Sequence, residues 1–226
     1  MQFYLDWQKN IYDLNNEEKF IRKFLNKDDE SLKVFISGTD EELVTVCKFL
    51  LNIPIEHLVN YINEDKYCTT DKVIQYSSLY HGIVDVPRVL KFINNNLSFN
   101  ELGKIIIKAS EEGACKKYGE NHAKLANELS MVLLERKGSI NVSNTAFGNF
   151  SVNLSDEDRI ELSRRLILRN DFIQKIIYLS KKGIVNYMDV ACEILSESTA
   201  KRRKSNVKQL LNLALKDNKL INNIVW

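Results

Sequence analysis

Proline is nearly absent from this sequence and glycine is scarce, with 2 prolines and 8 glycines among 226 residues. A sheet of many strands needs many such turn residues, so their scarcity favours helices joined by polar turns. At roughly 100–200 residues per domain, the length fits one large domain or two to three small ones. We therefore expect a mainly α-helical protein.

Residues that bind metals are also few. The 3 histidines and 4 cysteines are scattered, and no two cysteines have the Cys-x-x-Cys spacing of a structural zinc site. A glycine-rich phosphate loop is missing as well. We expect reduced, partly buried thiols in a reducing cytosol. The sequence predicts no metal, no cofactor and no catalytic residue of its own.

Long apolar runs are absent too. The sequence contains no stretch of the ~18 apolar residues that a membrane span needs. Residues 1–10 carry charge within their apolar stretch and lack the core of a signal peptide. These absences predict a cytoplasmic protein without a membrane partner.

The formal net charge is only +2, which by itself does not indicate a polyanion partner. The cations, however, are concentrated toward the C-terminus. Seven cations, with few acidic residues between them, precede the basic stretch at 201–208. They are Arg159, Arg164, Arg165, Arg169, Lys175, Lys181 and Lys182. Such asymmetry is the electrostatic footprint expected for binding to a phosphate backbone.

A pattern of helix, short helix, turn and helix occurs near 40–84, 98–150 and 170–220, in units of about 40–50 residues. Thr39 and Glu42 have the spacing of a capping box at the start of the first unit. A third helix is predicted there over 69–80.

Short β-hairpins are predicted beside these helices. Residues 81–84 follow the predicted third helix of the first unit and are interpreted as the start of a wing strand. Ile140 and Val142 alternate with polar residues, and the segment 140–150 is predicted to be a wing hairpin of the second unit.

In the third unit a capping box at Ser155 opens a helix, and the last long helix is predicted over 200–216. We expect tandem helix-turn-helix or winged-helix units with short β-hairpin wings. The predicted division is a helical arm over 1–38, and units over 39–97, 98–154 and 155–226.

The candidate site residues are polar and basic side chains at the start of the last long helix. A recognition helix presents such residues to base edges and phosphates. They are Ser198, Thr199, Lys201, Arg202, Arg203, Lys204, Ser205, Asn206 and Lys208. The corresponding helix of the second unit supplies Lys116, Lys117, Asn121, His122 and Lys124, and two further cations are Arg164 and Arg165. The alternative interpretation is a solvated basic face.

Three short stretches carry a resemblance to a known family: KYGENHAKLA at 117–126, TAFGNF at 145–150 and SESTAKRR at 196–203. They resemble winged-helix modules associated with restriction enzymes, and in particular the multi-winged-helix recognition regions of type IIS restriction and nicking endonucleases. The resemblance covers roughly residues 40–220. It implies that Ser198, Thr199, Arg202 and Arg203 approach DNA.

The nuclease domain usually fused to such a region is missing from this sequence. The resemblance therefore implies a recognition component that reads double-stranded DNA and works with a separate nuclease or methyltransferase subunit. A plasmid or phage replication initiator and a transcription regulator are alternatives, because tandem winged helices serve both. Further alternatives are a metal-dependent nuclease centred on Glu56, Glu64 and Lys66, and a scaffold that binds only proteins.

Overall fold

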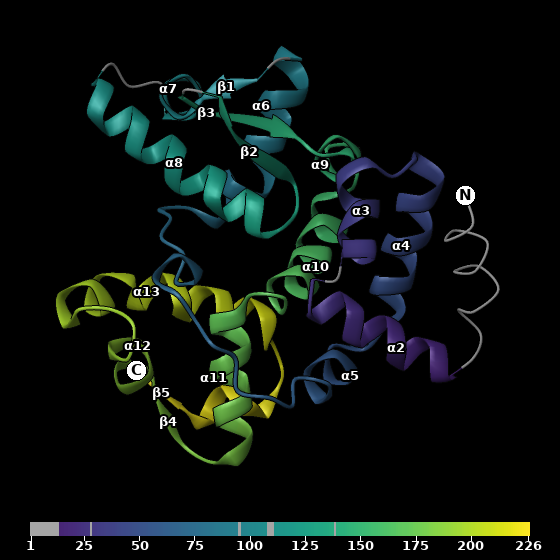
Figure 1. The fold of residues 1–226 in the computed structure, drawn as a ribbon, viewed down its shortest axis with the longest axis vertical. Helices are drawn as coiled ribbons and strands as arrows, with labels where there is room; N and C mark the ends of the chain where they lie inside the picture. Colours follow the sequence, from purple (N-terminus) through teal and green to yellow (C-terminus); the bar gives the residue numbers. More distant parts are fainter. Residues whose placement is uncertain (1–13, 28, 95, 108–110, 138) are drawn as a thin grey trace.

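The computed structural model describes residues 14–226 except 28, 95, 108–110 and 138. The chain is mainly helical, as predicted, and its strands form one small antiparallel sheet and one short parallel pair (Figure 1). The part of the predicted N-terminal arm before residue 14 lies outside the described residues. None of the helices in the described part of the chain is both long and apolar enough to cross a membrane.

The described chain begins with four helices, α2 (Leu14–Leu25), α3 (Asp29–Ser37), α4 (Asp40–Asn52) and α5 (Ile55–Asn60). The predicted capping box at the start of α4 is confirmed. The Thr39 N–H donates to Glu42 Oε2 over 2.8 Å, and the Glu42 N–H donates to Thr39 Oγ1 over 3.3 Å. These bonds satisfy amide groups that no earlier helical carbonyl can accept from, and so they fix where α4 begins.

A middle group of elements follows. It comprises a π-helical turn η2 (His81–Asp85), α6 (Val86–Ile93), β1 (Leu97–Ser98), α7 (Phe99–Ile107), α8 (Glu112–Glu128), β2 (Val132–Lys137) and β3 (Ser139–Asn144). The three strands form an antiparallel sheet in the order β1-β3-β2. Helix α8 lies between this sheet and the C-terminal helices (Figure 1).

The C-terminal elements are α9 (Ala146–Ser151), α10 (Asp156–Ile167), α11 (Asp171–Lys182), β4 (Val185–Asn186), α12 (Tyr187–Cys192), α13 (Glu197–Ala214), η3 (Lys219–Asn223) and β5 (Ile224–Val225). The predicted cap at Ser155 is present, since Ser155 Oγ accepts from the Asp158 N–H over 3.0 Å. The last strand returns to pair in parallel with β4.

The third helix predicted for the first unit is wrong. Within 69–80 the chain forms only a 3-10 turn, η1 (Thr70–Lys72), before the helix that begins at residue 79. Val73 and Tyr76 are nevertheless buried, and their carbonyl oxygens accept hydrogen bonds from Arg203 and Asn206 of α13. Tertiary hydrogen bonds therefore replace helical ones. The predicted wing strand at 81–84 is helical as well.

The hairpin predicted over 140–150 is also misplaced. The hairpin is formed by β2 and β3, and α9 occupies 146–151. Thr145 caps α9, because its Oγ1 accepts from the Gly148 N–H over 2.9 Å. A Cβ at Gly148 would lie 2.0 Å from the Met131 carbonyl oxygen, so the turn sits tightly on the end of β2. The predicted return strand is therefore a capped helical turn.

One continuous hydrophobic cluster joins all these elements, from Ile21 in α2 to Ile224 in β5. In the part formed by α2, α3 and α9, Phe24, Phe35 and Phe147 are buried, and the rings of Phe35 and Phe147 meet edge to face at 5.3 Å. The core therefore extends through the N-terminal, middle and C-terminal elements, which are packed on one another.

Candidate nucleic-acid interface

Helix α13 presents part of the predicted basic stretch to solvent. Lys201, Arg202, Ser205 and Lys208 are exposed, and Lys204 is half-buried. Among the described residues, neither Arg202 nor Lys204 has a hydrogen bond or ion pair to a partner. The Lys201 ammonium lies 2.5 Å from Glu197, and the Lys208 ammonium lies 5.5 Å from the centre of the Trp226 ring. Surface pairs of this kind are weak, so an anion can replace them.

The start of α13 contributes hydroxyl groups. Ser198 is exposed and Thr199 is half-buried. The Ser196 hydroxyl donates to Thr199 Oγ1 over 3.0 Å and makes no side-chain cap bond to the helix. These hydroxyls therefore bond one another next to the exposed cations.

Two predicted contact residues of α13 point inward instead. Arg203 Nη1 donates to the carbonyl oxygens of Thr70 and Val73 over 2.8 and 2.5 Å. Asn206 Nδ2 donates to the Tyr76 carbonyl over 2.6 Å, and Asn206 is only 8% exposed. Burial, and then the charge of Arg202, lowers the pKa of Arg203. Both side chains hold the chain at 70–76 against α13, so they are not free to bind a ligand.

Helix α8 presents a second basic face. Lys116, Lys117 and Lys124 are exposed, Asn121 is half-buried, and Glu120 lies between two of the lysines. The Glu120 carboxylate is 3.2 Å from the Lys117 ammonium and 2.6 Å from that of Lys124. Partial burial raises the pKa of Glu120, but the lysine hydrogen bonds outweigh it and lower that pKa. Lys116 has no hydrogen bond or ion pair within the described part of the chain.

His122, predicted as a contact residue, is fully buried. Its Nδ1 lies 2.8 Å from the Tyr118 carbonyl oxygen and its Nε2 lies 3.2 Å from the Ser78 amide nitrogen. These partners require Nδ1 to donate and Nε2 to accept, which is the neutral imidazole. Burial lowers the pKa of His122, against the bond to Tyr118, which raises it. This histidine joins α8 to the chain at 77–78 and does not face solvent.

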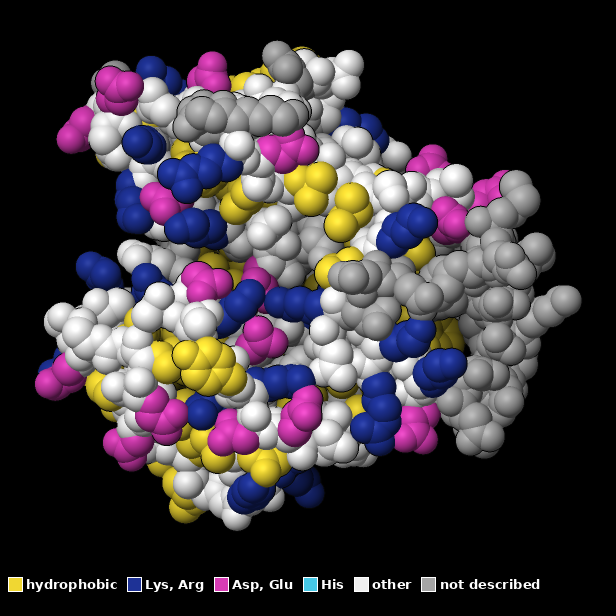
Figure 2. Space-filling model, viewed as in Figure 1, with side chains coloured by type: hydrophobic (Ala, Val, Ile, Leu, Met, Phe, Trp, Pro, Cys, Tyr) yellow, Lys and Arg dark blue, Asp and Glu magenta, His cyan; other side chains and the backbone are white. Residues whose placement is uncertain are grey.

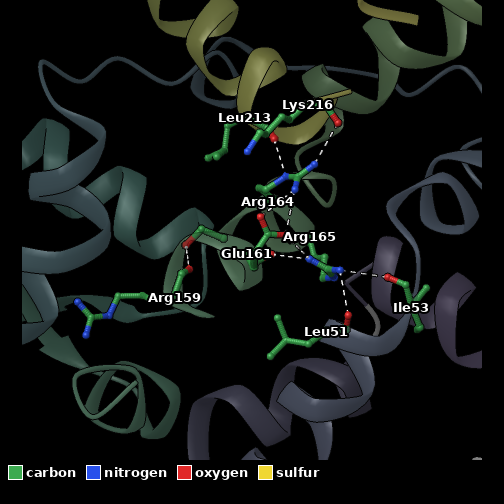
Figure 3. A network of polar contacts seen from close by, with 9 residues as sticks. Leu51, Ile53, Arg159, Glu161, Arg164, Arg165, Leu213 and Lys216 are labelled. Carbon is green, nitrogen blue, oxygen red and sulfur yellow. Dashed lines mark hydrogen bonds and ion pairs between the residues drawn. The ribbon is translucent and has the colours of Figure 1, made fainter. Parts of the chain in front are cut away.

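Arg164 and Arg165 are also used inside the protein (Figure 3). Arg164 donates to the carbonyl oxygens of Leu213 and Lys216 over 2.9 and 3.2 Å. Arg165 Nη2 reaches across to the carbonyls of Leu51 and Ile53 at the end of α4, over 3.1 and 3.2 Å. The Glu161 carboxylate accepts from both arginines. These two cations therefore join α10 to α13 and to α4.

The wider basic group behaves in the same way. Each of its other members donates to an internal acceptor: Arg159 to Ser151, Arg169 to Ser130, Lys175 to Asp65 and Glu193, Lys181 to Val59 and Ile62, and Lys182 to Tyr178. Of this group only Lys181 and Lys182 are exposed, so most of the predicted basic footprint lies inside the fold. Among the candidate site residues, the exposed cations are those of α8 and α13.

The two basic helices occupy matching places in similar element orders. A helix, a two-residue strand and a second helix precede each of them, as α6, β1 and α7 before α8, and as α11, β4 and α12 before α13. Counted from the helix start, the fourth, eleventh, fourteenth and fifteenth residues are buried in both: Cys115, His122, Leu125 and Ala126 in α8, and Ala200, Val207, Leu210 and Leu211 in α13.

This alignment brings the exposed cations into register. Lys116 and Lys117 are the fifth and sixth residues of α8, and Lys201 and Arg202 are the fifth and sixth residues of α13. Figure 2 shows Lys and Arg side chains on both sides of the hollow between α8 and α13. The sequence patterns pointed to both helices but did not reveal that their cations correspond.

Arg136 is a surface cation that sequence reasoning missed. It is exposed near the end of β2, two residues before Gly138, and makes no hydrogen bond or ion pair with a described residue. The signal was the Arg-Lys-Gly-Ser stretch at 136–139 between two apolar alternating segments, which is typical of a hairpin turn.

The alternative nuclease residues do not converge. Lys66 pairs with Glu64 and donates to Asn26 Oδ1 over 2.8 Å, and Glu56 on α5 makes no hydrogen bond or ion pair with either of them. Within the described ranges, no three His, Cys, Asp or Glu side chains are grouped closely enough to hold a metal ion.

Comparison with known protein families, with curated proteins and with solved structures finds no match. The assignment of a function therefore depends on the geometry of α8 and α13.

Proposed function

We propose that the protein binds double-stranded DNA through α8 and α13, which act as recognition helices of two related units. The observation that carries this proposal is the match between the helices: each presents an adjacent pair of exposed cations at its fifth and sixth residues. A recognition helix contacts DNA with its N-terminal part, and cations there bind the flanking phosphates.

The element order of the middle unit supports a winged helix. It runs helix, strand, helix, helix, strand, strand from α6 to β3, with the antiparallel sheet order β1-β3-β2. In a winged helix the third helix is the recognition helix and the last two strands form the wing. Helix α8 and the β2–β3 hairpin take these places, and the exposed Arg136 would be a wing contact to the backbone. The C-terminal unit repeats the order up to α13 and lacks the hairpin.

The side chains on the exposed faces favour a duplex over a single strand. Proteins that bind single strands stack bases on exposed aromatic side chains. The exposed residues in the first half of α13 are lysine, arginine, serine and glutamate, and the one aromatic residue of α8, Tyr118, is half-buried against His122. Lysine and arginine are suited to phosphates and to the edges of paired bases.

The resemblance to the recognition regions of type IIS restriction and nicking endonucleases extends this proposal. On that basis the protein is the DNA-recognition component of a restriction or defence system, and a nuclease or methyltransferase subunit supplies the chemistry. We expect the isolated chain to bind plasmid DNA without nicking it in Mg²⁺ or Mn²⁺. A transcription regulator or replication initiator would use the same interface and differ only in its partners.

Binding of a random-sequence duplex at rising salt tests the DNA contact, measured by fluorescence anisotropy. The wild type should show a steep fall of log affinity with log salt concentration. In Lys201→Ala/Arg202→Ala and in Lys116→Ala/Lys117→Ala, the slope should fall by about 2, because each phosphate contact contributes about 0.9.

The matched control is Lys33→Ala/Lys48→Ala, which removes two exposed cations from α3 and α4. This variant should keep the wild-type slope. If all three double variants lose the same slope, binding depends only on net charge and the proposed interface is wrong. If the wild type does not bind even at low salt, the protein does not bind DNA. The favoured interpretation is then a scaffold that binds only proteins.

A further inference from the structure

The chain between α5 and α6 connects the two basic helices. We call residues 70–80 the linking segment. Figure 1 shows the chain after α5 crossing α11 and α13 before it reaches α8. Although most of it is not helical, Val73, Ile74 and Tyr76 are 1–4% exposed. A segment that buries these three side chains is packed against the core and is not a flexible linker.

One end of the linking segment is bonded to α13. The Tyr76 hydroxyl donates to the Asn206 carbonyl over 2.8 Å, and the Asn206 side-chain amide donates back to the Tyr76 carbonyl over 2.6 Å. Arg203 adds two further bonds, to the carbonyls of Thr70 and Val73. Buried reciprocal hydrogen bonds of this kind allow one relative position, since a shift would leave polar groups unsatisfied.

The other end is bonded to α8. The Ser78 N–H donates to His122 Nε2 over 3.2 Å, and the Ser77 hydroxyl lies 3.3 Å from the same nitrogen. Just beyond, a Cβ at Gly82 would lie 2.5 Å from the Leu125 side chain of α8. The backbone therefore runs directly against α8, at the eleventh and fourteenth residues of that helix.

We propose that the linking segment acts as a ruler: it fixes the distance and angle between α8 and α13, so that the protein binds a bipartite duplex site whose two halves have a single allowed spacing. Tyr76, Asn206 and His122 are then positioning residues, which act on spacing without touching DNA. This inference rests on the proposed function, because it requires both helices to contact the same duplex.

The geometry of DNA makes spacing a sensitive measure of such rigidity. One inserted base pair rotates one half-site about the other by about 34–36° and moves it by about 3.4 Å. Two recognition helices on a flexible linker can follow this change. Two helices bonded to one buried segment cannot, so one of them must lose its contacts.

The test starts from a preferred site selected with the wild type from random duplexes. One and two base pairs are then inserted or deleted between its halves. Wild-type affinity should fall about tenfold or more with a single insertion, which is the size of effect that losing a few base contacts gives. In Tyr76→Phe and in Tyr76→Phe/Asn206→Ala, the ratio of affinities for the original and inserted sites should approach one, while the salt slope stays that of the wild type. The matched control is Tyr67→Phe, since Tyr67 is 89% exposed.

Rigidity is also measured without DNA. Pulsed EPR gives the distance distribution between spin labels on α8 and α13. The labels are attached at Ala114→Cys and Gln209→Cys, which are exposed positions, and Cys192→Ser removes the exposed native thiol. The distribution should be narrow in the wild type and broader in both linking-segment variants. Thermal melts test whether the variants remain folded. If the double variant does not fold, the comparison is made with Tyr76→Phe alone.

The outcomes separate the two proposals. Wild-type affinity that does not depend on spacing, or variants that keep a narrow distance distribution and strict spacing, overturns the ruler. Absence of any DNA binding overturns the proposed function, and a narrow distribution that broadens in the variants would then show only that the linking segment fixes the two helices.

Discussion

Whether an arginine of this protein bonds internally or stays free depends on which carbonyl oxygens lie within hydrogen-bonding distance of its guanidinium. Arg165 and Arg203 donate to backbone carbonyls of distant segments, whereas the neighbouring Arg202 reaches none of the described residues. Arg169 is fully buried and its guanidinium lies about equally far from the rings of Phe24 and Phe35, at 5.1 and 5.3 Å. Burial lowers the pKa of Arg169 to about 10. Buried guanidinium groups here connect elements, and the exposed Arg202 belongs to the candidate interface.

His122 should make stability depend on pH. Burial lowers its pKa in the folded protein below the value of about 6.5 that an unfolded chain has. The unfolded state then binds more protons below that value, so stability is fully present above it and is lost as the pH falls through the unfolded pKa. We expect the urea midpoint of the wild type to decrease between pH 7.5 and pH 5.5, and that of His122→Gln to decrease less.

The urea midpoints at pH 7.5 and pH 5.5 are compared within each variant, so a lower stability of His122→Gln at pH 7.5 does not affect the result. His81 lies close by, with its Nδ1 2.6 Å from the Asp85 carboxylate and its ring 5.7 Å from that of His122. Because His81 lies against His122, it does not serve as the control. The matched control is His57→Gln, at an exposed position on α5. An equal decrease in the wild type and in His122→Gln would assign the pH dependence to other groups.

At the scale of elements, the α7–α8 pair is unusually close. A Cβ at Gly119 would lie 1.9 Å from the Phe99 carbonyl oxygen, and a Cβ at Gly103 would lie 1.9 Å from that of Cys115. These are backbone atoms, which cannot turn aside as a flexible side chain can. The two glycines therefore set the separation of the helices in the proposed helix-turn-helix.

Gly119→Ala should lower the free energy of unfolding by about 1–3 kcal/mol or more, because overpacking forces the helices apart. The matched control is Gly113→Ala on the same helix, where an added Cβ meets nothing within 4 Å. There the change should stabilise the protein by up to about 1 kcal/mol through helix propensity. Urea unfolding measures both, and a tolerated Gly119→Ala would contradict the close packing.

At the scale of the whole molecule, a continuous core predicts joint unfolding. The hydrophobic cluster runs from Ile21 to Ile224, and the linking segment bonds α8 to α13. In a Trp7→Phe variant, Trp226 is the sole tryptophan, and its ring stacks on Tyr187 at 5.6 Å. Its fluorescence and the far-UV circular dichroism should report the same urea midpoint, as two-state unfolding requires. Two separated transitions would show that the units fold independently.

Much of the helical architecture was predictable from local sequence signals. Thr39 and Ser155 begin helices because their side chains accept from amide groups within the next turn, which depends on nearby residues alone. The apolar spacing likewise predicted α13 and the short helix α12, with ends that differ by a few residues, whereas the helix predicted to begin at Glu120 is α8, which begins at Glu112. The exposed cations of α8 and α13 were among the predicted site residues for the same reason.

The tertiary structure decided the rest. Tyr76 and Asn206 are 130 residues apart in the sequence, and their mutual hydrogen bonds stabilise a non-helical segment where local periodicity predicted a helix. Arg202 and Arg203 are adjacent, yet one faces solvent and the other the linking segment. Local sequence determines where a helix begins and which residues share its face. Which face is covered, and which cations remain free to bind a ligand, depends on partners that only folding brings within hydrogen-bonding distance.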